Sequence, residues 1–271
     1  MARPPAINDK REAARQEAAR LRAAQERRDK RNRFIAIGVM VVALLAFVGV
    51  VVFILQDSKK PPLEGVSTPT AATENGGIVT TTETGVDSSE AVEVGVYLDY
   101  MCPICAQFES INGESLDALN ETGKIKLVMH PVSILDRFSE GTEYSTRAAA
   151  AGAYVADQAP ENFVDFNAAM FANQPAEGST GLTNEQIADI ARAANVPEDV
   201  AGAIADGTAD EAFRDWVEGA TELATSDPNV AGERGFGTPT ITIDGKRWEG
   251  DWRVDGAIEA AVDEIAGTPA E

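Results

Sequence analysis

The sequence predicts an α/β domain that contains an inserted helical segment and follows one transmembrane helix. Three observations predict this arrangement: an uncharged apolar run near the N-terminus, two strand-like segments around an expected helix, and a long later stretch with apolar residues at helical spacing. We expect a basic tail at 1–33, an anchor at 34–55, a linker at 56–77, an α/β domain at 78–139 and 231–267, and a helical insertion at 140–230.

The uncharged run, Phe34 to Leu55, is long enough to cross a bilayer. As a helix rising about 1.5 Å per residue it spans about 33 Å, against about 30 Å of hydrocarbon. A cleavable signal peptide is the alternative, but its apolar region covers only about 7–15 residues, and no small-x-small cleavage site follows here. Basic residues crowd positions 27–33, so the positive-inside rule predicts a cytoplasmic N-terminus and an extracytoplasmic segment at 57–271.

Charge is distributed unevenly along the chain. Residues 1–33 carry eleven Lys or Arg and five acids, whereas the remainder carries twelve basic and thirty-nine acidic residues, a net charge of −27. An acidic body of this kind repels phosphate backbones, so we expect no nucleic-acid binding. We assign no function to the basic tail.

A strand–helix–strand unit follows the expected linker. Residues 78–82 are a short candidate strand, and residues 91–100 (AVEVGVYLDY) are a stronger one because they are β-branched and aromatic. A helix is expected from Pro103 to about Leu119, since proline suits the first helical position. Residues 125–132 form a second core strand, and such units cross over with a right hand.

The remaining elements are also indicated by local patterns. Two capping boxes, Thr183 with Gln186 and Thr208 with Glu211, are expected to open helices of the insertion. Strands return at 239–243 and 246–248, where the Asp-Gly pair between them favours a tight hairpin turn. A final helix follows, with Ile258, Val262 and Ile265 on one face.

The chemistry of the chain centres on its two cysteines, Cys102 and Cys105. Structural zinc needs four protein ligands, and His130 is the only histidine available to join these two, so we expect no metal site. Residues i and i+3 of a helix have Cβ atoms about 5–6 Å apart, close enough for a disulfide to form. Cys102 at the helix start is expected to be a stabilised thiolate, and Cys105, one turn inside, the resolving thiol. Their disulfide would be the redox group, with no other cofactor.

Three segments resemble one known family: YLDYMCPICAQF at 97–108, LDRFSEGTEYSTRAAAAG at 135–152, and GTPTITIDG at 237–245. Together they resemble the DsbA-like branch of the thioredoxin superfamily, in particular the membrane-anchored forms of high-GC Gram-positive bacteria. The resemblance covers about residues 78–266 and implies a thioredoxin fold. It also implies a cis bond between Thr238 and Pro239, which would expose the Thr238 backbone opposite the cysteines to a substrate strand. An ordinary trans proline at a strand start is the alternative.

Two positions depart from the family pattern within this candidate site. The dipeptide between the cysteines is Pro103-Ile104, whereas oxidases of the family often have histidine directly before the second cysteine. The buried acid that the family keeps six residues before the first cysteine is replaced by Val96. Asp99 is the nearest acid, and it is either a proton acceptor for the buried thiol or a solvated strand end.

The resemblance implies a function as well as a fold. It implies an oxidase that introduces disulfides into exported proteins with cysteine thiols and is reoxidised by a quinone-linked enzyme in the membrane. A reductase or isomerase would use the same site in another direction. A non-enzymatic, chaperone-like binding module is the alternative from a different class.

Overall fold

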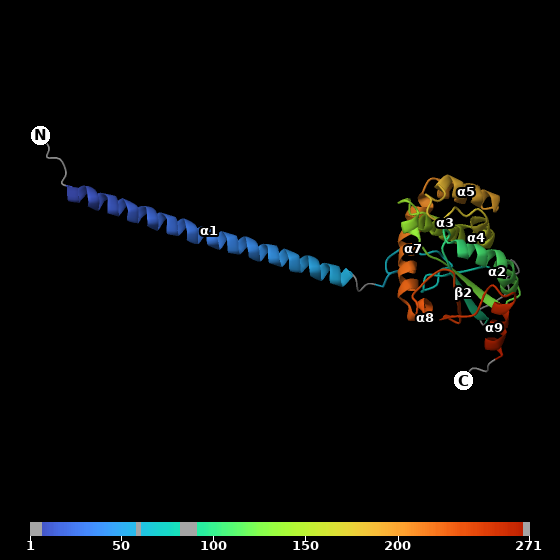
Figure 1. The fold of residues 1–271 in the computed structure, drawn as a ribbon. Helices are drawn as coiled ribbons and strands as arrows, with labels where there is room; N and C mark the ends of the chain where they lie inside the picture. Colours follow the sequence, from blue (N-terminus) through green and yellow to red (C-terminus); the bar gives the residue numbers. More distant parts are fainter. Residues whose placement is uncertain (1–6, 58–60, 82–90, 268–271) are drawn as a thin grey trace. The chain divides into compact units, whose positions relative to one another are not determined.

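The computed structural model describes residues 7–57, 61–81 and 91–267, which are drawn in Figure 1. The chain divides into two compact units, residues 1–60 and residues 61–271. The first unit contains α1 (Ile7–Asp57), one continuous helix of 51 residues. Residues 7–33 of the expected basic tail and the expected anchor are therefore parts of the same helix.

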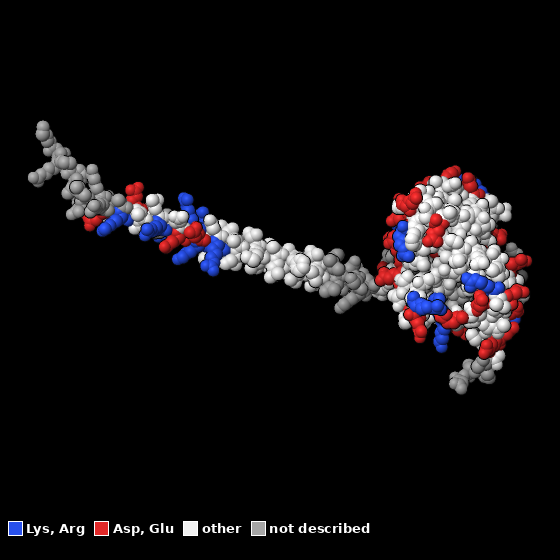
Figure 2. Space-filling model, in the orientation of Figure 1, with Lys and Arg blue, Asp and Glu red and all other residues white. Residues whose placement is uncertain are grey.

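The two halves of α1 differ in chemistry. Charged side chains gather on its first half, whereas the following stretch is uncharged (Figure 2). The large apolar side chains from Phe34 to Val50 are each at least 45% exposed. In the part of the chain that the structure describes, this is the one helix long and apolar enough to cross a membrane, by length and composition. An anchor and a signal sequence both meet that criterion.

A mixed five-stranded sheet forms the centre of the second unit. The strands lie in the order β1-β3-β2-β4-β5, with β2 parallel to β3 and the other neighbouring pairs antiparallel. Their bounds are β1 (Ile78–Val79), β2 (Val92–Leu98), β3 (Ile125–Pro131), β4 (Thr240–Ile243) and β5 (Lys246–Arg247). The central strand β2 is buried from Val94 to Leu98, which explains its nearly continuous apolar run.

Helix α2 (Pro103–Glu121) connects the parallel strands β2 and β3. Pro103 occupies its first turn, and the helix buries Cys105, Phe108 and Leu116. Near the C-terminal end of the chain, α9 (Ala257–Ala266) buries Ile258 and Val262. The strand–helix–strand prediction and the final helix are confirmed, and α2 ends two residues later than expected.

The helical insertion lies between β3 and β4. Its elements are η1 (Asp136–Phe138), α3 (Tyr144–Gln158), η2 (Pro160–Asn162), α4 (Phe163–Ala172), α5 (Asn184–Ala193), α6 (Glu198–Ala205), α7 (Thr208–Ser226) and α8 (Pro228–Ala231). The alanine-rich α3 is buried along most of its length and packs against α7. Small side chains allow helices to approach closely, so the alanines make α3 the central helix of this insertion.

Two details differ from the sequence predictions. The capping box at Thr183 is present, but the one at Thr208 is wrong. Gly207 occupies the N-cap position of α7 with φ of 90°, so Thr208 is already the first helical residue. The candidate strand at 78–82 is shortened to β1, and residue 82 lies outside the described residues.

The expected linker at 56–77 is wrong for its second part. Leu63 and Val66 pack against the core of the second unit, and the unit itself begins at residue 61. Thr70 donates two hydrogen bonds to Asp157 Oδ1, from its amide at 2.7 Å and from its hydroxyl at 2.6 Å. Residues 61–77 form no helix or strand, so their sequence shows no periodic pattern. They are attached to the second unit by apolar side chains and by the hydrogen bonds of Thr70.

Candidate active site

The two cysteines meet at the junction between β2 and α2. The chain turns after Leu98, and the Cys102 amide donates to the Asp99 carbonyl at 2.9 Å. Cys102 is the N-cap residue of α2 with extended backbone angles, and Cys105 lies in the first turn. Both thiols are free, with Cys102 6% exposed and Cys105 1% exposed. The more accessible sulfur is therefore the one at the helix start.

A cis proline lies opposite this helix start. The Thr238–Pro239 peptide bond is cis, as the resemblance implies. The Cys102 thiol donates to the Thr238 carbonyl at 3.4 Å, although the two residues are 136 positions apart. The fold thus brings the backbone before Pro239 against the first cysteine.

The two thiols differ in acidity. A hydrogen bond from the Cys105 thiol is the largest cause that lowers the pKa of Cys102, to about 6, with further help from the Thr238 side chain and the amides of Ile104 and Cys105. These donors outweigh burial, which acts in the opposite direction. Burial raises the pKa of Cys105 well above its ordinary value. At neutral pH the pair therefore holds one thiolate, on Cys102, and one thiol, on Cys105.

Asp99 is buried beneath the turn, with no exposed surface. Its Oδ1 accepts from the Met101 amide at 2.8 Å and the Ser145 hydroxyl at 2.7 Å, and its Oδ2 accepts from the Leu135 amide at 2.9 Å. Burial raises the pKa of Asp99 to about 7, against these hydrogen bonds, and the nearby Cys102 thiolate raises it further. The alternative of a solvated strand end is therefore wrong.

Gln174 is a contributor that sequence reasoning missed. It follows α4, and its Nε2 donates to the Tyr100 carbonyl at 3.0 Å and to the Cys102 carbonyl at 2.9 Å. A glutamine in a loop has no distinguishing sequence signal, because its role depends on where the insertion packs. Gln174 and Ser145 together hold the turn that carries Cys102 from the side of the insertion.

The other candidate residues lie as follows. Pro103 and Ile104 are exposed beside Cys102, and Ile104 is 43% exposed. His130 is buried in β3 and stacks on Tyr97, with ring centroids 3.9 Å apart. Burial lowers the pKa of His130 to about 3, so the ring is neutral and serves packing. Across 7–57, 61–81 and 91–267, no three His, Cys, Asp or Glu side chains gather as they would around a metal ion.

The fold and the paired cysteines are those of a thiol-disulfide oxidoreductase domain with a thioredoxin fold. Residues 82–264 match the family model described as Thioredoxin. The chain belongs to the thioredoxin family, within its DsbA-like oxidoreductases.

Solved structures of actinobacterial proteins share this fold. Reduced DsbA from Mycobacterium tuberculosis is 30% identical, with 74% of this chain and 91% of that one covered and a TM-score of 0.53. DsbG, a disulfide bond oxidoreductase of the same organism, is 28% identical, with 75% and 88% covered and a TM-score of 0.53. MdbA, a thiol-disulfide oxidoreductase from Actinomyces oris, is 23% identical, with 78% and 98% covered, and its TM-score of 0.57 shows a likeness of fold.

One curated relative is a much longer protein, of which only a part matches this chain. Serine/threonine-protein kinase PknE of Mycobacterium tuberculosis is 25% identical over 166 residues, which cover 60% of this chain and 27% of the kinase. The chain therefore spans about a quarter of the length of the curated relatives that it matches.

Proposed function

We propose that this protein introduces disulfides into exported proteins through the Cys102–Cys105 pair, on the outer side of the membrane. The unequal acidity of the two thiols carries the proposal. A cysteine that leaves readily as a thiolate makes its disulfide easy for substrate thiolates to attack. The apolar stretch of α1 and the excess of basic residues on its N-terminal side support an anchored protein with an extracytoplasmic catalytic unit.

The proposed cycle begins with the oxidised pair. A substrate thiolate attacks the Cys102 sulfur, the bond to Cys105 breaks, and the Cys105 sulfur takes up a proton because its pKa is high. A second substrate thiolate then attacks the substrate sulfur of the mixed disulfide, and Cys102 leaves as a stabilised thiolate. Two electrons pass to the cysteine pair, and a quinone-linked membrane enzyme would remove them again.

The substrate segment is proposed to lie beside Thr238 and Pro239. The Thr238 backbone faces Cys102, so an extended peptide can add there as a short strand while its cysteine meets the Cys102 sulfur. Exposed Ile104 offers an apolar contact next to the reacting atoms. The proposed cycle needs no group beyond the redox-active disulfide.

The size of the pKa shift limits how oxidising the pair can be. At pH 7 a thiol of pKa about 6 is about 90% ionised, whereas one at the ordinary 9.0 is about 1% ionised. The difference stabilises the reduced form by about 1.4 kcal/mol, which corresponds to about 30 mV for a two-electron couple. The acidity of Cys102 alone therefore supports a moderate oxidant and not a strong one.

The reduction potential of the full-length protein tests the direction of electron flow. Equilibration with glutathione buffers should give a value in the range of about −120 to −180 mV, whereas one near −270 mV would identify a reductase.

Ile104→His is the variant to compare with the wild type in the same measurement. An imidazole N–H beside the sulfurs should stabilise the thiolate further, so we expect a lower pKa for Cys102 and a more positive potential. A more negative potential in this variant would contradict the proposed role of the thiolate.

Asp99 is proposed as the proton acceptor for Cys105 when that thiol attacks a mixed disulfide. Its pKa of about 7 makes it a base above neutral pH and an acid below it. We expect Asp99→Asn to slow release of glutathione from a Cys102 mixed disulfide by about 100-fold. The wild-type rate should rise as the pH passes 7, and the variant should lack this rise. Stopped-flow measurement across pH 5.5–8.5 checks both effects.

The control for this experiment is Asp215→Asn, an exposed carboxylate of α7. It should leave the rate and its pH profile unchanged. Equal rates for Asp99→Asn and wild type would remove Asp99 from the proposed mechanism while leaving the exchange chemistry of the cysteines intact.

A further inference from the structure

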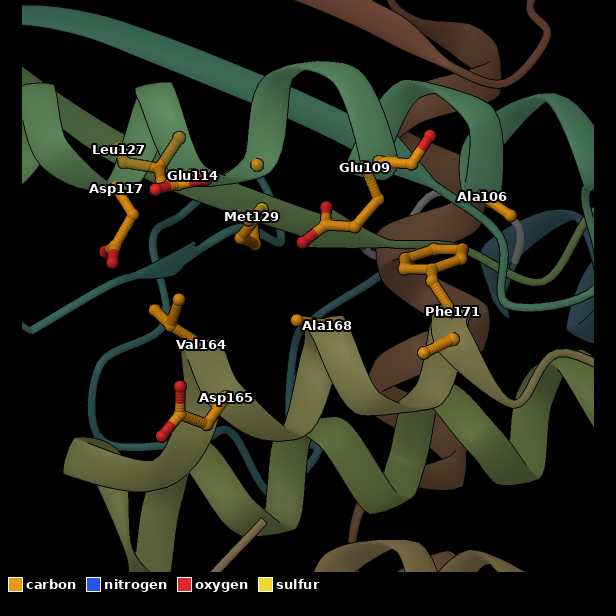
Figure 3. A pocket seen from close by; sticks show the side chains of 13 residues that line it. Ala106, Glu109, Glu114, Asp117, Leu127, Met129, Val164, Asp165, Ala168 and Phe171 are labelled. Atoms are coloured by element: carbon orange, nitrogen blue, oxygen red, sulfur yellow. The ribbon is translucent and has the colours of Figure 1, made fainter.

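A groove of about 410 Å³ lies between α2 and α4 (Figure 3). Leu127 and Met129 of β3 and Phe171 of α4 line it with apolar surface. Ala106, the residue after Cys105, lines it as well. The groove is thus separate from the Thr238 side of the site but begins within one residue of the redox pair.

Small side chains explain why this space is open. Ala106 and Gly113 on α2 face Ala168 and Ala172 on α4, where larger residues would close the gap. The lining residues of α2 from Ala106 to Asp117 recur at helical spacing, so one face of the helix borders the groove for about 16 Å. A groove of this length suits an extended peptide segment.

The groove is acidic as well as apolar. Its carboxylates come from both helices, and no Lys, Arg or His is among the described residues that line it; the acids are Glu109, Glu114, Asp117 and Asp165. The Glu109 carboxylate is directed from α2 into the space toward α4, where Ala168 and Phe171 lie (Figure 3). Burial is the largest cause that raises the pKa of Glu109, to about 7. A cation beside this carboxylate would replace the solvation that it lacks.

We propose that the groove binds a basic, partly apolar segment of the exported proteins whose cysteines this enzyme oxidises. A Lys or Arg of that segment pairs with Glu109, and its apolar neighbours pack on Met129 and Phe171. That the segment belongs to an exported protein rests on the proposed function. That the segment is basic rests on the negative charge of the groove.

The helix geometry also limits the spacing within the substrate. Glu109 lies seven residues after Cys102, about 10 Å along α2. An extended chain covers about 3.5 Å per residue. A basic residue about three positions from the reacting cysteine therefore spans this separation along an extended substrate segment.

Binding of cysteine-free peptides to the full-length protein tests the groove independently of redox chemistry. The probe is a fluorescent peptide of alternating Arg and Leu, and its counterpart has Glu in place of Arg. At low salt we expect at least about tenfold tighter binding of the Arg peptide, a preference that shrinks as salt is added. Equal binding of the two peptides would overturn the proposal.

Two variants locate the binding. Glu109→Gln removes the charge of a half-buried carboxylate, and Ala168→Leu, at an exposed position of α4, fills the groove without changing charge. Each should weaken binding of the Arg peptide about tenfold, whereas Glu218→Gln on α7 should not. Unchanged binding in Ala168→Leu would show that the peptide lies elsewhere.

A cysteine placed in the same peptides separates this inference from the proposed function. Oxidation of both peptides at equal kcat/KM would sustain the oxidase and overturn the groove. A preference for the Arg peptide that is lost in Glu109→Gln would support both. Selective binding of the cysteine-free Arg peptide without any oxidation would support the groove alone, as part of a binding module.

Discussion

Replacing Cys102 with serine is expected to abolish thiol-disulfide exchange while leaving the fold intact. Sulfur at this position is attacked by the substrate and later leaves as a thiolate, and a hydroxyl oxygen can do neither. Serine is nearly the same size as cysteine, and its hydroxyl can donate to the Thr238 carbonyl as the Cys102 thiol does. Oxidation of a dithiol peptide should fall to the uncatalysed rate, and circular dichroism should be unchanged.

Cys105→Ala is the matched variant for this experiment. It keeps the attacked sulfur but removes the thiol that resolves the intermediate, so substrates should accumulate on Cys102 in complexes that dithiothreitol releases.

Alkylation of the reduced wild type near pH 6 should modify Cys102 first, because only its pKa lies near that value. Faster modification of Cys105 would contradict the assignment. Unchanged partner binding after replacement of both cysteines would favour the chaperone-like alternative.

Tyr100→Ala is expected to destabilise the second unit by about 3–5 kcal/mol, as for other large aromatic residues deleted from cores. The side chain has no exposed surface and lies two residues after the end of β2. Its ring lies 5.1 Å from that of Phe171, and its hydroxyl donates to Asn167 Oδ1 at 3.0 Å. The substitution would leave a cavity where α4 packs on the active-site turn. A lower urea midpoint at unchanged slope checks this expectation.

Tyr100→Phe separates the hydrogen bond from the packing. It should cost about 1–3 kcal/mol, because it leaves the buried Asn167 oxygen without its donor. Phe138→Ala is the control for loss of an aromatic ring, since Phe138 is 38% exposed, and its cost should be below that of either Tyr100 variant. A Tyr100→Ala protein as stable as Phe138→Ala would mean that α4 is held to the turn by other contacts.

Local patterns were sufficient to predict the centre of the fold. The β-branched residues before Cys102 form β2, and Pro103 begins α2, because both depend on neighbours in sequence. The thioredoxin fold and the cis bond before Pro239 came from the resemblance, and the structure agrees with both. The second capping box failed because the same pattern fits a helix that starts one residue earlier, at a glycine N-cap.

The surroundings of the site could not be predicted in the same way. Asp99 has the same sequence context whether it is solvated or buried, and its state is decided by Leu135 and Ser145, which reach it from beyond β3. Gln174 reaches the turn from still farther along the chain. The packing of Leu63 and Val66 depends equally on contacts with distant residues. Such long-range contacts leave no periodic trace in one sequence.

The bonds from Gln174 and Ser145 have a consequence for how this enzyme can be engineered. Because both residues belong to the segment between β3 and β4, that segment supplies part of the scaffold that sets the acidity of the reacting groups. In a chimera that carries the corresponding segment of a relative, different side chains would surround the active-site turn. The pKa values of the reacting groups would then change, even with every residue from Tyr100 to Cys105 retained. We therefore expect the strength of the redox pair to depend on the inserted segment as well as on the cysteine motif.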